Sequence, residues 1–218
     1  MDKRNLLIED GYALQLLRPL LSGPYLPFTN SSLRPLCIAY LLNDIVVNAR
    51  KSILEFGSGL STIVMARLIK MNNTGSKIVS VEHNRKWASV VQTFIEREAL
   101  EDIVSILYAP LVQCNTSIDS NLWYDLDAGV FAGIVFDMVV IDGPPAYEVS
   151  KELSRYPALP FIYDRISDRS SVFLDDADRW GERAIISRWE KEYPVHFNII
   201  GDSFACCLRG DHFNLNVF

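Results

Sequence analysis

The chain has 218 residues, of which 49% are hydrophobic and 22% are charged, and its formal net charge is −6. This composition indicates an ordinary globular protein of one domain with a sizeable core, or one domain with a small appendage. The acidic balance disfavours proteins whose main task is to grip nucleic acid, because these usually carry a basic face.

Cysteine usage and the lengths of the apolar runs argue against further classes. The four cysteines form no CxxC pair and are accompanied by only three histidines, so a zinc site is not expected. Glu9 and Asp10 interrupt the N-terminal apolar stretch before a signal-peptide core forms, and no apolar run approaches the roughly 18 residues that span a bilayer. We therefore expect a cytoplasmic protein with reduced thiols and no membrane association.

Short β-rich runs alternate with helical patterns along the chain, which is typical of a parallel sheet covered by helices. A helix is predicted from Pro35, with Ser31 or Ser32 as its cap, after an ordered but irregular segment at 23–30. Strands are then predicted at 52–56, 77–82, 104–108, 134–142 and 171–175. Further helices are predicted at 61–70, 84–100 and 178–193, with an interrupted helical pattern at 147–163.

The C-terminal part of the chain adds an antiparallel element to this sheet. The runs 195–200 and 204–209 are separated by the short "GDS" segment, which predicts a hairpin. The predicted fold is therefore α/β: a Rossmann-like, doubly wound sheet that is mostly parallel and ends in an antiparallel hairpin.

The segment "ILEFGSGLST" carries the strongest functional signal. Gly57 and Gly59 allow a sharp turn close to a ligand, and the helix that follows offers unpaired N–H groups. A dinucleotide site would need a third glycine where Thr62 stands, and Glu55 would repel a pyrophosphate but suit a cationic group. A nicotinamide-dependent dehydrogenase is therefore disfavoured, and a tight connection that binds no ligand remains as the plain alternative.

The same segment resembles the first motif, acid-x-G-x-G, of the class I S-adenosylmethionine-dependent methyltransferases, through Glu55, Gly57 and Gly59. Glu82 lies 25 residues beyond Gly57 and is similar to the acid of the family's second motif, which can accept hydrogen bonds from both hydroxyls of a ribose. The resemblance implies S-adenosylmethionine as the cofactor. The cofactor contacts that it implies are Glu55, Gly57, Ser58, Gly59, Ser61, Thr62, Glu82, His83, Ala109 and Asp142.

The resemblance also covers the C-terminal half. The segments "DGPP", "RYPALP" and "LDDADRWGERAIISRWEKEYP" look like a group of bacterial class I methyltransferase-like proteins with poorly defined substrates, and the similar region spans 24–209. It implies the class I methyltransferase fold, with an S-adenosylmethionine-binding domain at 51–218. Residues 1–50 are expected to form a helical and irregular segment that caps the site.

Three acids follow the fourth and fifth predicted strands. Asp142 ends the fourth strand, and Asp175 and Asp176 end the fifth. In the methyltransferase order, strands one, four and five are neighbours, so we expect these acids to converge where open α/β sheets bind ligands. Close carboxylates repel one another unless a cation or a proton intervenes, and hard oxygen ligands suit Mg²⁺ or Ca²⁺. The arrangement is similar to metal-dependent O-methyltransferases of the catechol type, although those have an acid plus an amide in place of the second and third acids.

Alternatives to a metal site remain open at this point. Asp142 would then contact the ammonium group of the cofactor or orient the substrate. Asp175 or Asp176 would cap the following helix, or pair with Arg179 or Arg183. The sequence leaves the metal-bound and the metal-free site equally open.

The predicted function is transfer of a methyl group from S-adenosylmethionine to an oxygen of a small-molecule or sugar acceptor, with Mg²⁺ as one way to activate the acceptor. The candidate catalytic residues, and candidate metal ligands, are Asp142, Asp175 and Asp176. The candidate residues around the acceptor, unless they are core packing, are Tyr25, Pro27, Thr29, Trp123 and Tyr124. The expected partner is a small molecule, nucleic acid is disfavoured, and a homodimer is compatible with the sequence.

Two further functions stay open. "DGPPAY" resembles the acid-Pro-Pro-aromatic motif of methyltransferases that act on the nitrogen of a nucleic-acid base, but Gly143 and Ala146 interrupt that pattern. The second is a non-catalytic methyltransferase-like protein that binds a nucleoside or serves as an interaction subunit.

Overall fold

The computed structural model describes residues 3–217. The predicted parts 1–50 and 51–218 extend past these bounds, so Met1, Asp2 and Phe218 lie outside the described residues. The helices are α1 (Lys3–Leu21), α2 (Pro35–Val47), α3 (Leu60–Asn72), α4 (Arg85–Arg97), α5 (Ala158–Ile162) and α6 (Trp180–Glu192), with 3-10 helices at Ala128–Phe131 and Tyr163–Arg165. The strands are β1 (Ser52–Phe56), β2 (Lys77–Glu82), β3 (Val104–Tyr108), β4 (Leu111–Val112), β5 (Trp123–Tyr124), β6 (Phe136–Ile141), β7 (Ile166–Leu174), β8 (Asn198–Ile200) and β9 (Phe204–Arg209).

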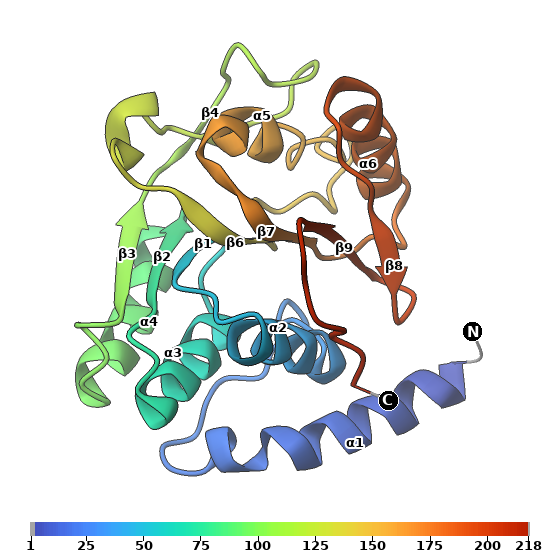
Figure 1. Cartoon of the computed structure of the whole chain (residues 1–218). Coiled ribbons are helices and arrows are strands. Elements are labelled where there is room, and N and C mark those ends of the chain that lie inside the picture. Colours follow the sequence, from blue (N-terminus) through green and yellow to red (C-terminus); the bar gives the residue numbers. More distant parts are fainter. Residues whose placement is uncertain (1–2, 218) are drawn as a thin grey trace.

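A seven-stranded sheet in the order β3-β2-β1-β6-β7-β9-β8 forms the centre of the molecule (Figure 1). Strands β3, β2, β1, β6 and β7 pair in parallel, whereas β9 is antiparallel to both β7 and β8. This arrangement confirms the predicted doubly wound, mostly parallel sheet with its C-terminal antiparallel hairpin. Because β1 lies between β2 and β6, the carboxyl ends of β2, β1, β6 and β7 follow one another along a single edge.

Helices cover both faces of this sheet, with α1 to α4 below it and α5 and α6 above it in Figure 1. Successive strand residues alternate between the two cores: Ile53 packs on the α3 side and Leu54 on the α6 side, and both are fully buried. Covering both faces explains why the strands read as continuous apolar runs. Ala13 and Leu17 of α1 belong to the same core as α3, so the predicted boundary after residue 50 does not separate two cores.

The start of α2 differs from the prediction. Arg34 occupies the cap position and makes no side-chain capping bond, so the predicted capping by Ser31 or Ser32 is wrong. The N–H of Leu36 instead donates to Asp10 Oδ1 at 3.2 Å, and Asp10 Oδ2 accepts from Arg34 Nε at 3.0 Å. The first turn of α2 is therefore capped from α1, by a residue 26 positions earlier in the chain.

Most other elements match their predicted bounds to within three residues, and two differ by more. The pattern at 147–163 contains only the short helix α5, and β7 begins at Ile166 instead of Ser171. Asn84 caps α4, since its Oδ1 accepts the N–H groups of Lys86 and Trp87 at 3.1 and 3.2 Å.

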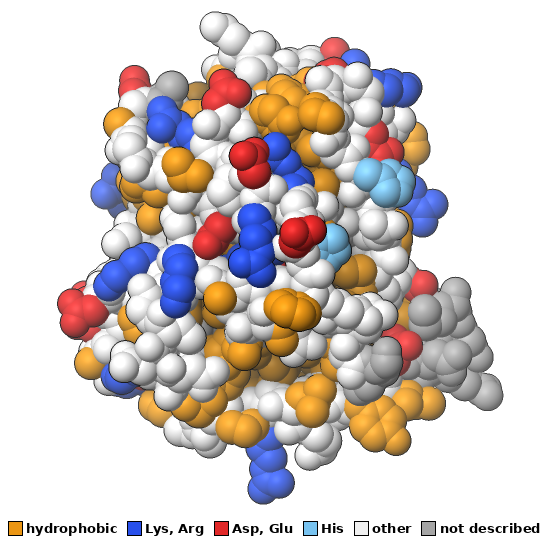
Figure 2. All heavy atoms as spheres, in the orientation of Figure 1, with side chains coloured by type: hydrophobic (Ala, Val, Ile, Leu, Met, Phe, Trp, Pro, Cys, Tyr) orange, Lys and Arg blue, Asp and Glu red, His pale blue; other side chains and the backbone are white. Residues whose placement is uncertain are grey.

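The face of the molecule shown in Figure 2 carries charges of both signs and is more apolar over its lower part, near α1. The exposed apolar side chains of α1 are Leu7, Ile8, Tyr12, Leu14 and Leu16. Within residues 3–217, none of the helices combines the length and the apolar character that a bilayer crossing requires.

Candidate active site

The loops after β1 and β6 touch each other through their backbones. Gly57 has φ +97°, and a Cβ added to it would lie 2.9 Å from the carbonyl oxygen of Asp142. A Cβ on Gly143 would lie 3.1 Å from Gly57 Cα and 2.3 Å from the Tyr124 hydroxyl oxygen. Only glycine allows both the left-handed backbone at Gly57 and this close approach. The two glycines therefore bring the first motif and the strand-four acid into contact.

Backbone hydrogen bonds extend the sheet through the site. The N–H of Asp142 donates to Phe56 O at 2.9 Å, and the N–H of Asp175 donates to Ile141 O at 3.0 Å. The N–H of Ala109 donates to Glu82 O at 2.9 Å on the other side of β1. These bonds hold the predicted site residues in register at the carboxyl edge. The side chain of Ala109 is buried in the apolar core.

Glu55 fastens the first turn of α3 to β1. Its carboxylate is fully buried and accepts hydrogen bonds from Ser61 Oγ at 2.6 Å, Thr62 Oγ1 at 2.5 Å and Ser80 Oγ at 2.7 Å. Burial raises the pKa of Glu55, and the three hydroxyl groups partly offset that rise. The hydroxyl of Thr62 also accepts the N–H of Gly59 at 2.9 Å. Glu55, Ser61 and Thr62 thus build the loop, and Glu55 does not point into the site as a free partner for a cationic group.

Glu82 is held against the glycine loop from the end of β2. Its Oε2 accepts from Ser58 N at 3.2 Å and Ser58 Oγ at 3.0 Å, while Oε1 accepts from Asn84 N at 2.7 Å and lies 3.1 Å from His83 Nδ1. Burial raises the pKa of Glu82, but hydrogen bonds from His83, Asn84 and Ser58 outweigh burial and leave this pKa below its ordinary value. Trp87 Nε1 donates to Ser58 O at 2.8 Å and closes the loop from α4. An ionised acceptor therefore stands beside Gly57, as the ribose prediction requires.

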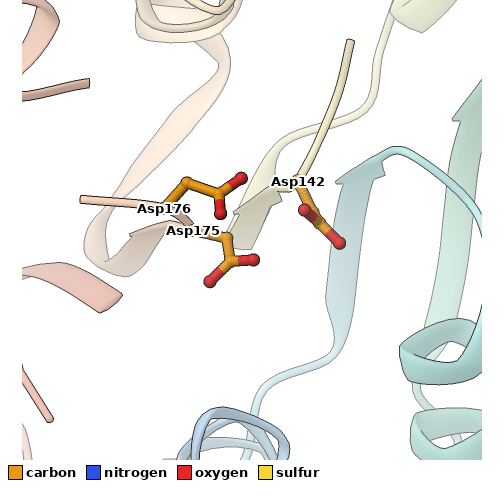
Figure 3. A group of neighbouring side chains, drawn as sticks. All are labelled: Asp142, Asp175 and Asp176. Atoms are coloured by element: carbon orange, nitrogen blue, oxygen red, sulfur yellow. The ribbon is translucent and has the colours of Figure 1, made fainter. Parts of the chain in front are cut away.

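Asp142, Asp175 and Asp176 converge as predicted. Each offers a carboxylate oxygen within 4.8 Å of the others. In Figure 3 the carboxylates of Asp142 and Asp175 point to the same side, and that of Asp176 points toward them. Burial and the neighbouring Asp175 raise the pKa of Asp142 well above its ordinary value, and burial together with Asp176 raises the pKa of Asp175 to about 6. The first two acids thus form a pair that binds a proton readily near neutral pH.

Arg155 is the site residue that sequence reasoning missed. It is 3% exposed, and it lies in "RYPALP", between β6 and β7 in the chain. Nε donates to Pro144 O at 3.2 Å, Nη1 to Asp175 O at 3.0 Å and Nη2 to Asp142 O at 3.4 Å. Nη2 also lies 3.5 Å from Asp142 Oδ1 and 3.0 Å from Asp176 Oδ2. One guanidinium therefore joins the loops after β6 and β7.

Glu182 and Arg179 complete the charges around Arg155. Glu182 is fully buried in the first turn of α6, with Oε1 3.6 Å from Arg155 Nη1. Among the described residues, neither of its carboxylate oxygens has a hydrogen-bond partner. Burial raises the pKa of Glu182 to about 7, and Arg155 opposes that rise. Arg179 Nη1 lies 2.7 Å from Asp176 Oδ2, which confirms the predicted pairing, and no side chain caps α6.

Trp123 and Tyr124 pack above the end of β1. Both are buried, and their ring centroids lie 5.0 and 5.7 Å from that of Phe56. Trp123 belongs to the core, which favours the packing alternative for that residue. The hydroxyl of Tyr124 is buried beside Gly143 with no hydrogen-bond partner among the described residues. Tyr124 therefore offers an unused polar group at the junction of the two loops.

The other three candidate acceptor contacts, Tyr25, Pro27 and Thr29, lie in the connection from α1 to α2. Tyr25 is 82% exposed, and it follows Pro24, whose carbonyl accepts from Arg67 Nη2 at 3.2 Å in the middle of α3. The backbone N–H of Thr29 donates to Ser32 Oγ at 3.0 Å within its own turn. Their role around an acceptor stays a prediction.

The donor chemistry of the three acids suits Mg²⁺, but two of their oxygens already face arginines. A Mg²⁺ ion would stand about 2.1 Å from each ligand oxygen. Asp176 Oδ2 already has Arg155 Nη2 at 3.0 Å and Arg179 Nη1 at 2.7 Å, and Asp142 Oδ1 has Arg155 Nη2 at 3.5 Å. An ion shared by these two oxygens would therefore lie against a buried guanidinium of the same sign.

A family model described as a methyltransferase domain matches residues 54–177, which include Asp142, Asp175 and Asp176. None of the curated proteins compared matches this chain. Among solved structures, an O-methyltransferase from Bacillus cereus in complex with SAH is 17% identical over 92% of this chain and 90% of its own, with a TM-score of 0.56.

Two other solved structures are similar to the same extent. An O-methyltransferase from Streptomyces achromogenes involved in tomaymycin synthesis, in complex with SAM, is 16% identical over 93% of this chain and 90% of its own, with a TM-score of 0.58. A putative caffeoyl-CoA O-methyltransferase from Staphylococcus aureus is 15% identical over 96% and 99%, also with a TM-score of 0.58. The family match over more than half of the chain and this shared architecture show that the protein belongs to the methyltransferase-domain family and has the class I methyltransferase fold.

Proposed function

We propose that the protein transfers a methyl group from S-adenosylmethionine to a hydroxyl oxygen of a small acceptor. The observation that carries the proposal is the placement of Glu82 and Asp142 on either side of Gly57, at the ends of the two strands that flank β1. Further support comes from the solved structures described above, which are O-methyltransferases and in two cases contain SAM or SAH.

Glu82 and the glycine loop are suited to the nucleoside part of this cofactor. The carboxylate of Glu82 is ionised and fixed by the backbone N–H groups of Ser58 and Asn84, and ribose hydroxyls would donate to it in place of Ser58 Oγ and His83. The absence of a side chain at Gly57 lets the ligand approach the backbone at the start of α3. The unpartnered hydroxyl of Tyr124 supplies one further donor nearby.

Asp142 and Asp175 are suited to receive a proton from the acceptor. When bound, S-adenosylmethionine supplies a methyl group on a positively charged sulfur. With the cofactor bound, the acceptor oxygen would take the methyl group, the electrons of the carbon–sulfur bond would stay on sulfur, and the hydroxyl proton would pass to the carboxylate pair of Asp142 and Asp175. A base works best when its pKa lies near the working pH, and the pKa of Asp175 is raised to about 6 by burial and by Asp176.

The base-methylating alternative is less favoured by the turn after Asp142. The carbonyl of Pro144 accepts from Arg155 Nε at 3.2 Å, so this turn serves to hold the buried arginine. Tyr147, the aromatic residue of "DGPPAY", is 70% exposed. Methylation of an oligonucleotide, together with no activity on hydroxylated small molecules, would favour this alternative over our proposal.

Calorimetry with S-adenosylmethionine, S-adenosylhomocysteine and NAD tests the cofactor assignment. We expect the first two to bind and NAD not to bind; the reverse result would refute the proposal. Glu82→Gln should weaken binding of the first two by about 1–3 kcal/mol, the scale of hydrogen bonds to a charged group. The exposed Glu101→Gln is the matched control and should bind as the unmodified protein does.

A panel of phenols, catechols and sugars, followed by mass spectrometry, tests the acceptor class. The expected product carries one additional methyl group on oxygen. Asp142→Asn should remove turnover while cofactor binding is retained, because the acid is proposed to act on the acceptor proton. Full turnover in a folded Asp142→Asn variant would contradict that role.

A further inference from the structure

The guanidinium of Arg155 stands where the carboxylates after β6 and β7 come together. Nη2 lies 3.5 Å from Asp142 Oδ1 and 3.0 Å from Asp176 Oδ2, and Nη1 lies 3.6 Å from Glu182 Oε1. The side chain is almost completely buried, so water screens these charges little. A single cation thus serves acids from two strand ends and from the first turn of α6.

Arg155 is fixed in this position by the backbone. Its three nitrogens donate to the carbonyl groups of Pro144, Asp175 and Asp142 at 3.2, 3.0 and 3.4 Å. These carbonyls belong to the same loops that carry the acids. If this planar guanidinium moved away, three buried carbonyl oxygens would lose their hydrogen-bond donor, which is costly.

The charges of the three aspartates and the two arginines show how far Arg155 balances the acids of the site. When all three acids are ionised, Asp142, Asp175 and Asp176 contribute three negative charges, and Arg155 and Arg179 contribute two positive charges. Asp176 Oδ2 lies 3.0 Å from Arg155 Nη2 and 2.7 Å from Arg179 Nη1, whereas the carboxylates of Asp142 and Asp175 point to one side (Figure 3). The three acids offer oxygens within 4.8 Å of one another, and Arg155 already lies beside two of them, Asp142 and Asp176.

We propose that Arg155 is the resident cation of this site: it holds the acids after β6 and β7 together in the role that a bound Mg²⁺ would otherwise fill. Arg155 is thus a positioning residue, which acts on the acceptor only through the acids. Together with the function proposed above, this means that methyl transfer proceeds without a divalent metal. The charge arrangement itself does not depend on which cofactor or acceptor binds.

Titration of the protein alone with MgCl₂, followed by calorimetry, and with MnCl₂, followed by electron paramagnetic resonance of free Mn²⁺, tests this proposal. The unmodified protein should show no saturable binding up to roughly 10 mM, well above the weakest protein sites for such ions. Arg155→Gln should create a site for one ion with at least about tenfold tighter binding, because three acids lose their shared cation. If Arg155 had a purely structural role, its removal would not create a metal site.

Two matched variants complete the experiment. Arg155→Lys keeps the charge and should behave as the unmodified protein does. Arg179→Gln removes the other arginine beside Asp176, which is 38% exposed, and should not create a metal site while Arg155 remains. If Arg155→Gln does not fold, the unmodified protein and Arg155→Lys decide the question, and absence of saturable binding in both supports the proposal.

The proposal is overturned if the unmodified protein binds one Mg²⁺ or Mn²⁺ saturably and Asp175→Asn abolishes that binding. It is also overturned if a folded Arg155→Gln binds these ions no more tightly than the unmodified protein. Both measurements omit S-adenosylmethionine. Failure of cofactor binding would therefore refute the proposed function and leave the result for Arg155 standing.

Discussion

Glu182→Gln should make the stability of the protein less sensitive to pH. Burial raises the pKa of Glu182 from its ordinary 4.5 to about 7, so the folded state favours the protonated carboxyl. The stability that this group contributes is fully present below pH 4.5 and is lost as pH rises through about 7. The two pKa values differ by about 2.5, which corresponds to about 3.4 kcal/mol at about 1.36 kcal/mol per unit. About 0.8 kcal/mol of this is already lost at pH 5, so about 2.5 kcal/mol remains to be lost between pH 5 and pH 8.5.

Glutamine has nearly the shape of the protonated acid and does not ionise, so the variant should escape this loss. Urea unfolding followed by tryptophan fluorescence and circular dichroism, at pH 5 and pH 8.5, gives the free energy of unfolding of both proteins. The exposed Glu101→Gln is the control and should track the unmodified protein at both pH values. A difference between Glu182→Gln and the unmodified protein that changes by less than about 0.5 kcal/mol over this range would refute the reasoning.

Three further substitutions test contacts around the site. Gly143→Ala should lower the free energy of unfolding by about 1–3 kcal/mol in urea unfolding, since its Cβ would lie 2.3 Å from the Tyr124 hydroxyl and 3.1 Å from Gly57 Cα; unchanged stability would contradict this. Tyr124→Phe should keep or increase that free energy, by up to about 1–3 kcal/mol, because it removes a buried hydroxyl without a partner. Cofactor affinity measured by calorimetry should fall in the same variant, and lower stability with unchanged affinity would count against the assignment. Asp10→Ala should lower the free energy of unfolding by about 1–2 kcal/mol, because it removes the cap on Leu36. Unchanged stability would contradict this and would indicate that water replaces the cap.

Much of the sheet could be predicted because its strands are covered on both faces. The bounds of β1, β2 and β3 coincide with the predicted runs 52–56, 77–82 and 104–108. At least half of the residues in each of these runs are apolar. The start of β7 could not be predicted in this way, because residues 167–169 are polar and extend the strand past the core. Backbone pairing with β9 stabilises the next residue of that stretch, since Ser170 pairs with Arg209, and pairing leaves little trace in hydrophobicity.

The acids of the site could be predicted from the sequence, whereas the buried arginine beside them was missed. Strand ends place Asp142 and Asp175 from local pattern alone, but nothing near Arg155 in the sequence indicates which carbonyls it will meet. The direction of Glu55 could have been found from alternation. Glu55 lies two residues after Ile53, which packs on the α3 side, so Glu55 faces that side too. Its proximity to the glycine loop suggested a cofactor contact, whereas its contacts are with hydroxyl groups of α3 and β2.

The hydrogen bonds from Arg155 to three carbonyl groups also have a consequence for folding. The arginine lies in the connection between β6 and β7, and its partners lie at the ends of those two strands. Its bonds form only when both strands have docked, so the acids acquire their fixed places at the moment the sheet closes around them. The arrangement of Asp142, Asp175 and Asp176 therefore depends on the docking of both strands.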